Sequence, residues 1–263
     1  MQPQTPRLTL TPIRSIAALM LREMSTTYGR TLLGYLWSLA EPVGGIILLT
    51  VVFGFVAAAP ALGDSFPLFF ATGVLPFMAY QATAANVGQS IRFSRQLLAY
   101  PNVSFIDTLL ARFILTVVVQ TIVAGAVLAA IILWFGLRLD IEPVLVLQAL
   151  AMSFALGAGV GTLNCVLNSL IPSWPFVWAV LNRPLFLITG IFFLVDQIPP
   201  PFRDLLALNP LTHPVMRLRE GFYGGYTAPL ISEPFVYLVS LSLLVTGLVL
   251  LWRHHDAIVE DAV

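Results

Sequence analysis

Residues 113–137 read FILTVVVQTIVAGAVLAAIILWFGL, a run of 25 residues that contains no charged side chain. An α-helix needs about 20 apolar residues to cross the roughly 30 Å of hydrocarbon in a bilayer. This run is therefore long enough to form one membrane span. Across the 263 residues of the chain, 58% are hydrophobic and 10% are charged, whereas a soluble domain carries about 25% charged residues. The composition excludes a water-soluble fold.

Further spans are predicted by the same length criterion. Residues 143–182 are 40 residues without a charge, which is too long for one crossing, and Pro172, Ser173 and Pro175 interrupt them. That run predicts a helical hairpin of two spans. The sequence therefore predicts an all-α membrane protein of a single domain with six transmembrane helices, at residues 35–59, 66–88, 108–137, 143–170, 174–195 and 234–253.

The distribution of arginines predicts the orientation of these spans. Positive side chains are retained on the cytoplasmic side of a membrane. With the N-terminus placed inside, nine of the 13 basic residues fall in cytoplasmic segments and four fall outside. We therefore expect a multi-pass membrane protein whose N- and C-termini are both cytoplasmic.

The charged and sulfur-containing residues exclude several functions. The chain has no lysine, so it cannot form the GxxxxGK[ST] loop that binds the phosphates of ATP. Its net charge of zero gives no basic field that would attract nucleic acid. The single cysteine, Cys165, cannot form an intrachain disulfide, and its apolar neighbours indicate a core thiol. We expect no catalytic residue, no metal site and no bound cofactor in this chain.

Two cytoplasmic segments lie outside the predicted spans. Residues 10–28 repeat apolar side chains at helical spacing, with Arg14 and Arg22 off the apolar stripe. This pattern predicts an amphipathic helix in the membrane interface, and a short packed helix is the alternative.

Residues 89–106, here called the coupling segment, form the largest polar connection on the cytoplasmic side. They are predicted to dock a cytosolic partner, and an ordinary positive-inside loop is the alternative. The predicted docking residues are Arg92, Arg95, Gln96, Tyr100 and Pro101.

The longest polar stretch comprises residues 196–232. Three prolines near its start are followed by short helical patterns around residues 202–208 and 215–222, and neither pattern is long enough to span. Non-spanning helices at membrane depth are tolerated where protein or a water-filled cavity covers them. The stretch therefore predicts re-entrant gate helices on the external side, and a solvated external loop is the alternative.

Two motifs resemble a known family. The first comprises Tyr28-Gly29-Arg30, Leu33-Gly34-Tyr35-Leu36-Trp37 and Glu41-Pro42. The second comprises Asn209-Pro210-Leu211, His213, Arg217, Arg219 and Gly221-Phe222-Tyr223-Gly224-Gly225-Tyr226. Both resemble capsule polysaccharide export permeases, the KpsM-like branch of type-2 ABC exporters. The resemblance covers essentially the whole chain.

The resemblance implies an assembly and a cargo. Such a permease is a homodimer that binds two copies of a separate ATPase, and that partner holds the ATP and Mg²⁺. The family's interfacial helix, coupling helix and gate helices are similar to the three segments above. The implied cargo is a long, often acidic, lipid-linked polysaccharide that crosses the bacterial inner membrane, while O-antigen and teichoic acid exporters share the architecture. Outer-membrane export machinery is a further candidate partner. The implied external gate contains Phe202, Asn209, Pro210, Arg217, Arg219 and Tyr223.

Aromatic residues and one arginine are the candidates for the substrate pathway. Sugar rings have apolar faces that stack on aromatic side chains, and a conduit needs many weak contacts because its cargo must leave. Arg183 is predicted to lie within the fifth span, where an arginine is costly and faces a bundle interior or a watery cavity. For Arg183 the alternative is snorkelling to the headgroups or pairing inside the protein. For the aromatic residues the alternative is packing against lipid or a neighbouring helix. The predicted pathway contains Trp37, Trp178, Arg183, Phe186 and Phe193.

Two other classes of function fit the sequence less well than an ATP-driven exporter does. A gradient-driven transporter uses ionisable groups near the bilayer midplane, and the clear span interiors contain no Asp or Glu. A membrane enzyme of lipid-linked sugars needs clustered carboxylates or histidines. Asp196 and Asp204 come nearest, without an obvious base beside them. The exporter accounts for more of the pattern than either alternative.

Overall fold

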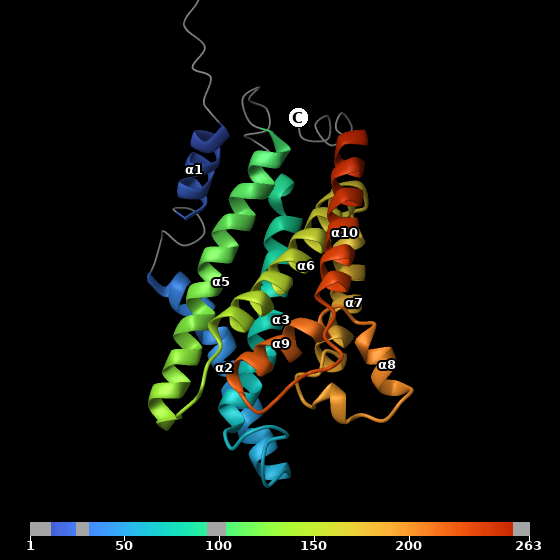
Figure 1. Ribbon diagram of the computed structural model, residues 1–263. Coiled ribbons are helices and arrows are strands. Elements are labelled where there is room, and N and C mark those ends of the chain that lie inside the picture. The colour runs from blue at the N-terminus through green and yellow to red at the C-terminus, as the bar shows by residue number, and fades with distance from the viewer. Residues whose placement is uncertain (1–11, 25–31, 94–103, 255–263) are drawn as a thin grey trace, which may run out of the picture.

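The computed structural model describes residues 12–24, 32–93 and 104–254. Within these ranges the chain forms helices and their connections (Figure 1). Five of the described helices are long and apolar enough to cross a membrane, which confirms the all-helical membrane fold. They lie within three residues of the predicted span ends, and they are α2 (Leu32–Val56), α3 (Phe66–Gly88), α5 (Phe105–Phe135), α6 (Pro143–Leu170) and α10 (Glu233–Arg253).

The helix predicted at residues 174–195 is shorter than expected. Helix α7 begins at Trp174 and ends at Ile188, after 15 residues, which span about 22 Å at 1.5 Å per residue. Gly190 then adopts a positive φ of 83°, and the chain continues into a short 3₁₀ helix, η2 (Val195–Gln197). The prediction was wrong beyond Ile188, because a turn replaces the last two helical turns. The six-span count stays a prediction that depends on α7.

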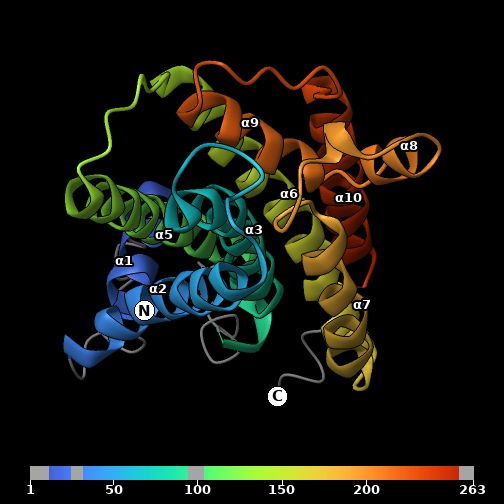
Figure 2. The same ribbon diagram turned by 90° about the horizontal axis from the view of Figure 1, so that it is seen from below.

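Helix α3 forms the centre of the bundle. It packs against α2, α5 and α6, and Figure 2 shows it enclosed by these helices. Ser65 caps its first turn by accepting a hydrogen bond from the Leu68 amide at 3.5 Å. Its apolar side chains make up much of the main core, together with Val127 of α5 and Met152 of α6. Burial on all sides explains why the apolar residues of α3 show no amphipathic stripe.

Glycines on α6 allow its neighbours to approach closely. A Cβ atom on Gly157 would lie 2.5 Å from Cβ of Thr83 on α3, and one on Gly159 would lie 2.4 Å from the Ser240 carbonyl oxygen on α10. Gly247 on α10 meets the Leu163 amide nitrogen of α6 at 2.8 Å in the same way. Membrane helices associate through such small residues, because packing replaces the hydrophobic driving force in lipid.

The two ends of the bundle carry the shorter helices. At one end, here called the α1 end, α1 (Pro12–Glu23) packs against α5, and α10 ends at this same end of the bundle (Figure 1). At the opposite end, the α9 end, lie α8 (Phe202–Ala207) and α9 (Thr212–Phe222). Helix α9 packs against α3 and α6 and is largely buried. A fully solvated loop, the alternative for this stretch, is therefore wrong for α9.

Candidate functional site

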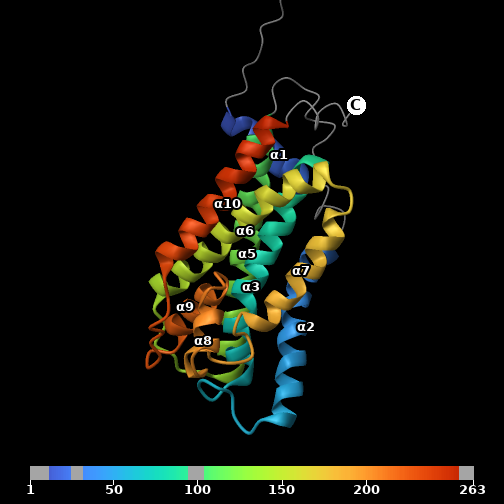
Figure 3. The same cartoon turned by 90° about the vertical axis from the view of Figure 1, so that its right-hand side faces the viewer.

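Helices α2 and α7 leave one side of the molecule weakly covered. They lie along the same side of the bundle, as two views at right angles show (Figures 2 and 3). None of the residues of α7 is buried, and only 11% of the spanning window of α2 is buried. Large apolar side chains such as Phe55 and Phe176 are exposed there. This surface, the α2/α7 face, is available for lipid, for another chain or for cargo.

The predicted pathway residues do not form one cluster. Trp37 is 75% exposed on α2, and Arg183 is exposed on α7. Within the described residues, Arg183 makes no hydrogen bond or ion pair. Trp178 is half-buried on α7, while Phe193 lies beyond the end of that helix. Trp37, Trp178, Arg183 and Phe186 therefore lie on α2 or α7, and Phe193 does not.

Phe186, the fifth predicted pathway residue, belongs to an aromatic cluster that joins three elements. Its ring meets Phe77 of α3 edge to face at 5.2 Å and Phe192, beyond α7, at 5.3 Å. Phe192 in turn stacks with Phe53 of α2 at 5.7 Å. Sequence reasoning missed Phe53, Phe77 and Phe192, because nothing in their spacing separates these rings from the many other phenylalanines of the spans.

Glu41 is a charged residue on α2 that the sequence showed only within the first motif. It lies exposed within a helix whose spanning window begins at Trp37. In the described part of the chain it has no hydrogen bond or ion pair. The two helices of the α2/α7 face thus each carry one exposed charge of opposite sign, Glu41 and Arg183.

At the α9 end, Arg219 is the residue that closes the turn after α7. Its guanidinium is 1% exposed and donates to the carbonyl oxygens of Gly190 at 2.8 Å, Ile191 at 2.9 Å and Phe193 at 2.9 Å. It also lies over the ring of Phe69, 4.2 Å from the centroid. Burial lowers the pKa of Arg219 to about 10, so the group stays charged at neutral pH. Arg219 holds the α7 turn and is not on the surface.

The other predicted gate residues pack around α9, with one exception. Arg217 pairs with Glu220 at 2.9 Å and with Glu233 at the start of α10, and Asn209 accepts a hydrogen bond from the Leu211 amide at 3.1 Å. Pro210 and Tyr223 are half-buried, whereas Phe202 is 66% exposed on α8. The set forms a packed unit with an exposed phenylalanine beside it, and its role as a gate stays a prediction.

His213 fastens the start of α9 to both of its neighbours. Its Nδ1 accepts from the Ser232 amide at 3.2 Å, so its Nε2 carries the proton and donates to the Ala207 carbonyl oxygen at 3.0 Å. Burial lowers the pKa of His213 below its usual 6.5, because the imidazolium would lose its water. The neutral imidazole therefore links the end of α8, α9 and the segment before α10.

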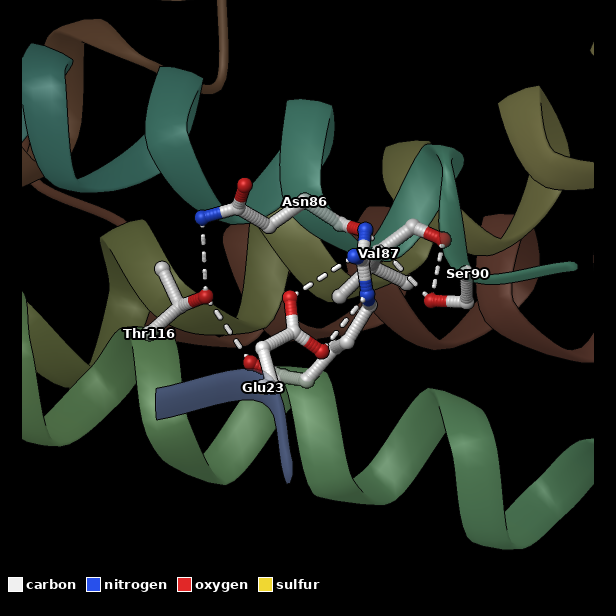
Figure 4. A network of polar contacts seen from close by, with 6 residues as sticks. Glu23, Asn86, Val87, Ser90 and Thr116 are labelled. Atoms are coloured by element: carbon white, nitrogen blue, oxygen red, sulfur yellow. Dashed lines mark hydrogen bonds and ion pairs between the residues drawn. The ribbon is translucent and has the colours of Figure 1, made fainter. Parts of the chain in front are cut away.

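At the α1 end, Arg112 of α5 is the centre of a buried polar network. Figure 4 labels its partners Glu23 and Asn86, together with Thr116. Nη2 and Nε of Arg112 bind the two carboxylate oxygens of Glu23 on α1 at 2.7 and 3.0 Å. Its Nη1 donates to the carbonyl oxygen of Asn86 on α3 at 3.0 Å. The Asn86 amide donates to the Thr116 hydroxyl at 3.0 Å, and that hydroxyl donates to the Arg112 carbonyl oxygen at 2.8 Å. Three helices thus meet on one side chain.

This network borders the coupling segment. The guanidinium of Arg112 lies over the ring of Phe93, 4.3 Å from its centroid, in the short helical continuation after α3. Arg92 is exposed beside it. The other predicted docking residues lie outside the described residues: Arg95, Gln96, Tyr100 and Pro101. The sequence assigned Arg112 only to the cytoplasmic positive charge and gave no sign of Glu23, which is 89 residues away.

The chain matches a family model described as ABC-2 type transporter over residues 14–223, which comprises α2 to α9 and most of α1. The chain belongs to the ABC-2 type transporter family. Both polar centres of this ABC-2 chain, around Arg112 and Arg219, lie inside the matched region. The resemblance deduced from the two motifs is thereby confirmed.

Named relatives of this ABC-2 chain match along most of its length. The polysialic acid transport protein KpsM of Escherichia coli is 30% identical over 249 residues, 94% of this chain and 96% of that protein. The capsule polysaccharide export inner-membrane protein CtrC of Neisseria meningitidis serogroup B is 28% identical over 237 residues, 89% of each chain. The O-antigen export system permease protein RfbA of Klebsiella pneumoniae is 23% identical over 219 residues, 78% of each chain.

Proposed function

We propose that this chain is the membrane-spanning subunit of an ATP-driven exporter that carries a polysaccharide across the bacterial inner membrane, with both termini in the cytoplasm. Its near full-length similarity to a polysialic acid transporter and to capsule export proteins is the observation that carries the proposal. Capsule polysaccharide is favoured over O-antigen, because the match to the O-antigen permease is weaker and shorter. Outer-membrane export machinery is a candidate recipient of the polymer.

The energy for transport comes from another chain in this proposal. The chain has no lysine for a phosphate-binding loop, and its family is named for transporters of the ABC type. We infer a homodimer that binds two copies of a separate ATPase through the coupling segment, and ATP and Mg²⁺ are bound by that ATPase.

The charges on the α2/α7 face support a pathway or a protein interface on this side. A charged side chain facing lipid costs about 2.5–3.5 kcal/mol on insertion scales, so such residues face bundle interiors or watery cavities. Glu41 and Arg183 are exposed on helices of this face. Two copies that bring their α2/α7 faces together would enclose these groups and provide a water-filled route with aromatic walls.

Purification tests the assembly. The protein alone is expected to hydrolyse no ATP, because it lacks the phosphate-binding lysine, and it is expected to co-purify with a separate nucleotide-binding subunit in a two-plus-two complex. Native mass spectrometry gives the stoichiometry, and ATP turnover is measured with and without the partner. Substantial ATP hydrolysis by the purified chain in the absence of any partner would overturn the proposal.

Substitution of Arg183 tests the pathway. Arg183→Ala is expected to lower surface polysaccharide by about tenfold or more, because one charge-assisted contact to an anionic sugar or phosphate is worth about 1.5–3 kcal/mol. Arg183→Lys keeps the charge and is expected to retain part of the export. Arg138→Ala serves as the control, since Arg138 is exposed between α5 and α6. Normal export by Arg183→Ala, with normal assembly, removes Arg183 from the pathway.

A further inference from the structure

Resting on the proposed function, we propose that Arg112 is a positioning residue for energy coupling: it joins α1, α3 and α5 to the base of the coupling segment, so that a partner docked on this segment moves three helices together. The geometry that points to this role is the division of one guanidinium among separate elements. Nε and Nη2 of the guanidinium bind the carboxylate of Glu23 on α1, and Nη1 donates to the Asn86 carbonyl oxygen of α3. The face of the guanidinium lies over the ring of Phe93.

The contact with α3 is made at the carbonyl oxygen that joins this helix to the coupling segment. The Asn86 oxygen also accepts from the Gln89 amide at 3.3 Å and from the Ser90 hydroxyl at 3.4 Å, both at the start of that segment. Asn86 is two residues from the end of α3 at Gly88, and its oxygen accepts from Arg112 at 3.0 Å. The coupling segment begins directly after this end. A displacement of the segment therefore acts on a carbonyl that is bound to α5.

The contact with α1 places a negative charge where helix electrostatics disfavour it. Glu23 is the last residue of α1, and a carboxylate near a helix C-terminus is repelled by the helix dipole. The bidentate pair with Arg112 offsets this repulsion and fixes the orientation of the two planar groups. An acidic residue at this position is not explained by helix propensity. It is explained by a specific link between α1 and α5.

Burial makes stability an insufficient explanation for the pair. Arg112 is 4% exposed, and removing two charges from water costs several kcal/mol, so that replacing a buried ion pair by apolar residues is often neutral or stabilising. Apolar residues of similar volume often hold helices together as firmly as such a pair does. The charged pair adds a fixed geometry among three helices, and that property is useful where movement of one element must be passed to the others.

The test separates export from assembly and from ATP hydrolysis in the complete complex. Glu23→Ala removes the carboxylate link between α1 and Arg112 and leaves Arg112 able to bind the Asn86 carbonyl. Arg112→Met keeps the length of the side chain and removes all of its donors. We expect both variants to assemble in normal amounts and to hydrolyse ATP within about twofold of the unaltered complex, while surface polysaccharide falls by about tenfold or more, equivalent to about 1.4 kcal/mol. Glu23→Gln keeps an acceptor for the guanidinium and is expected to export at an intermediate level.

The controls distinguish this role from a structural one. Glu142→Gln makes the same chemical change at an exposed N-cap carboxylate that forms no side-chain capping bond, and it is expected to export normally. Export that falls only in proportion to the amount of complex, or loss of assembly in Glu23→Ala as well as in Arg112→Met, would show a merely structural network and overturn the proposal. Unchanged export in both variants would overturn it too. Failure of the proposed function is recognised separately, because the unaltered chain would then neither bind an ATPase nor support polysaccharide export.

Discussion

Substitution of Gly159 by valine is expected to remove most of the folded protein from the membrane. A Cβ atom at this position would lie 2.4 Å from the Ser240 carbonyl oxygen and 3.2 Å from Cβ of Leu243, both on α10. Overpacking costs about 1–3 kcal/mol where side chains can adjust. Here the nearest atom belongs to the backbone, so α6 and α10 must separate. We expect a loss of several degrees in Tm and a large fall in the monodisperse fraction in size-exclusion chromatography.

The matched control is Gly125→Val on α5. A Cβ atom on Gly125 would have no neighbour within 4 Å, so the same change in helix propensity is made without a clash. The comparison therefore isolates the contact between α6 and α10. Equal Tm values for the two variants would show that these helices do not approach as closely as the positions of Gly159 and Gly247 indicate.

The length and spacing of apolar runs were sufficient to predict the long helices. The breaks also followed from local chemistry where a breaker was present, as at Pro172 between α6 and α7 and at Pro175 in the first turn of α7. The end of α7 could not be predicted in this way. Residues 189–195 are apolar enough to continue a span, and only Gly190 marks the turn. The decisive donor is Arg219, 29 residues after Gly190.

For the candidate site residues too, contacts between residues distant in the sequence could not be predicted. Charge on an apolar background singled out Arg183, which is exposed on α7, and its role in the pathway stays a prediction. The pairing of Arg112 with Glu23 depends on the packing of α1 against α5, which no local pattern encodes. Aromatic residues were the least predictable. Phe186 packs against Phe77 of α3, while Trp37 is exposed. Both were predicted pathway residues, because sugar rings stack on aromatic side chains.

Replacement of Arg219 by leucine is expected to abolish export by releasing the end of α7. The substitution keeps an apolar contact with Phe69 and removes every donor to the carbonyl oxygens of Gly190, Ile191 and Phe193. A buried acceptor left without a partner costs about 1–3 kcal/mol. Three such losses at one turn exceed what a local rearrangement of side chains can offset. Hydrogen exchange of the amides at residues 188–195 is expected to accelerate by at least about a hundredfold, equivalent to about 2.7 kcal/mol.

Two further variants show whether the donors of Arg219 are responsible. Arg219→Lys supplies an ammonium group in place of the planar guanidinium, so it can bind some of the three carbonyl oxygens. Amide hydrogen exchange at residues 188–195 is therefore expected to be slower in Arg219→Lys than in Arg219→Leu. Arg203→Leu is the control at the α9 end, because in the described part of the chain Arg203 pairs only with its exposed neighbour Asp204 at 3.3 Å, and exposed pairs contribute about 0–1 kcal/mol. If Arg219→Leu leaves exchange at residues 188–195 unchanged, Arg219 does not hold the turn. If exchange accelerates while export stays normal, the end of α7 is held by Arg219 but its rigidity is not required for transport.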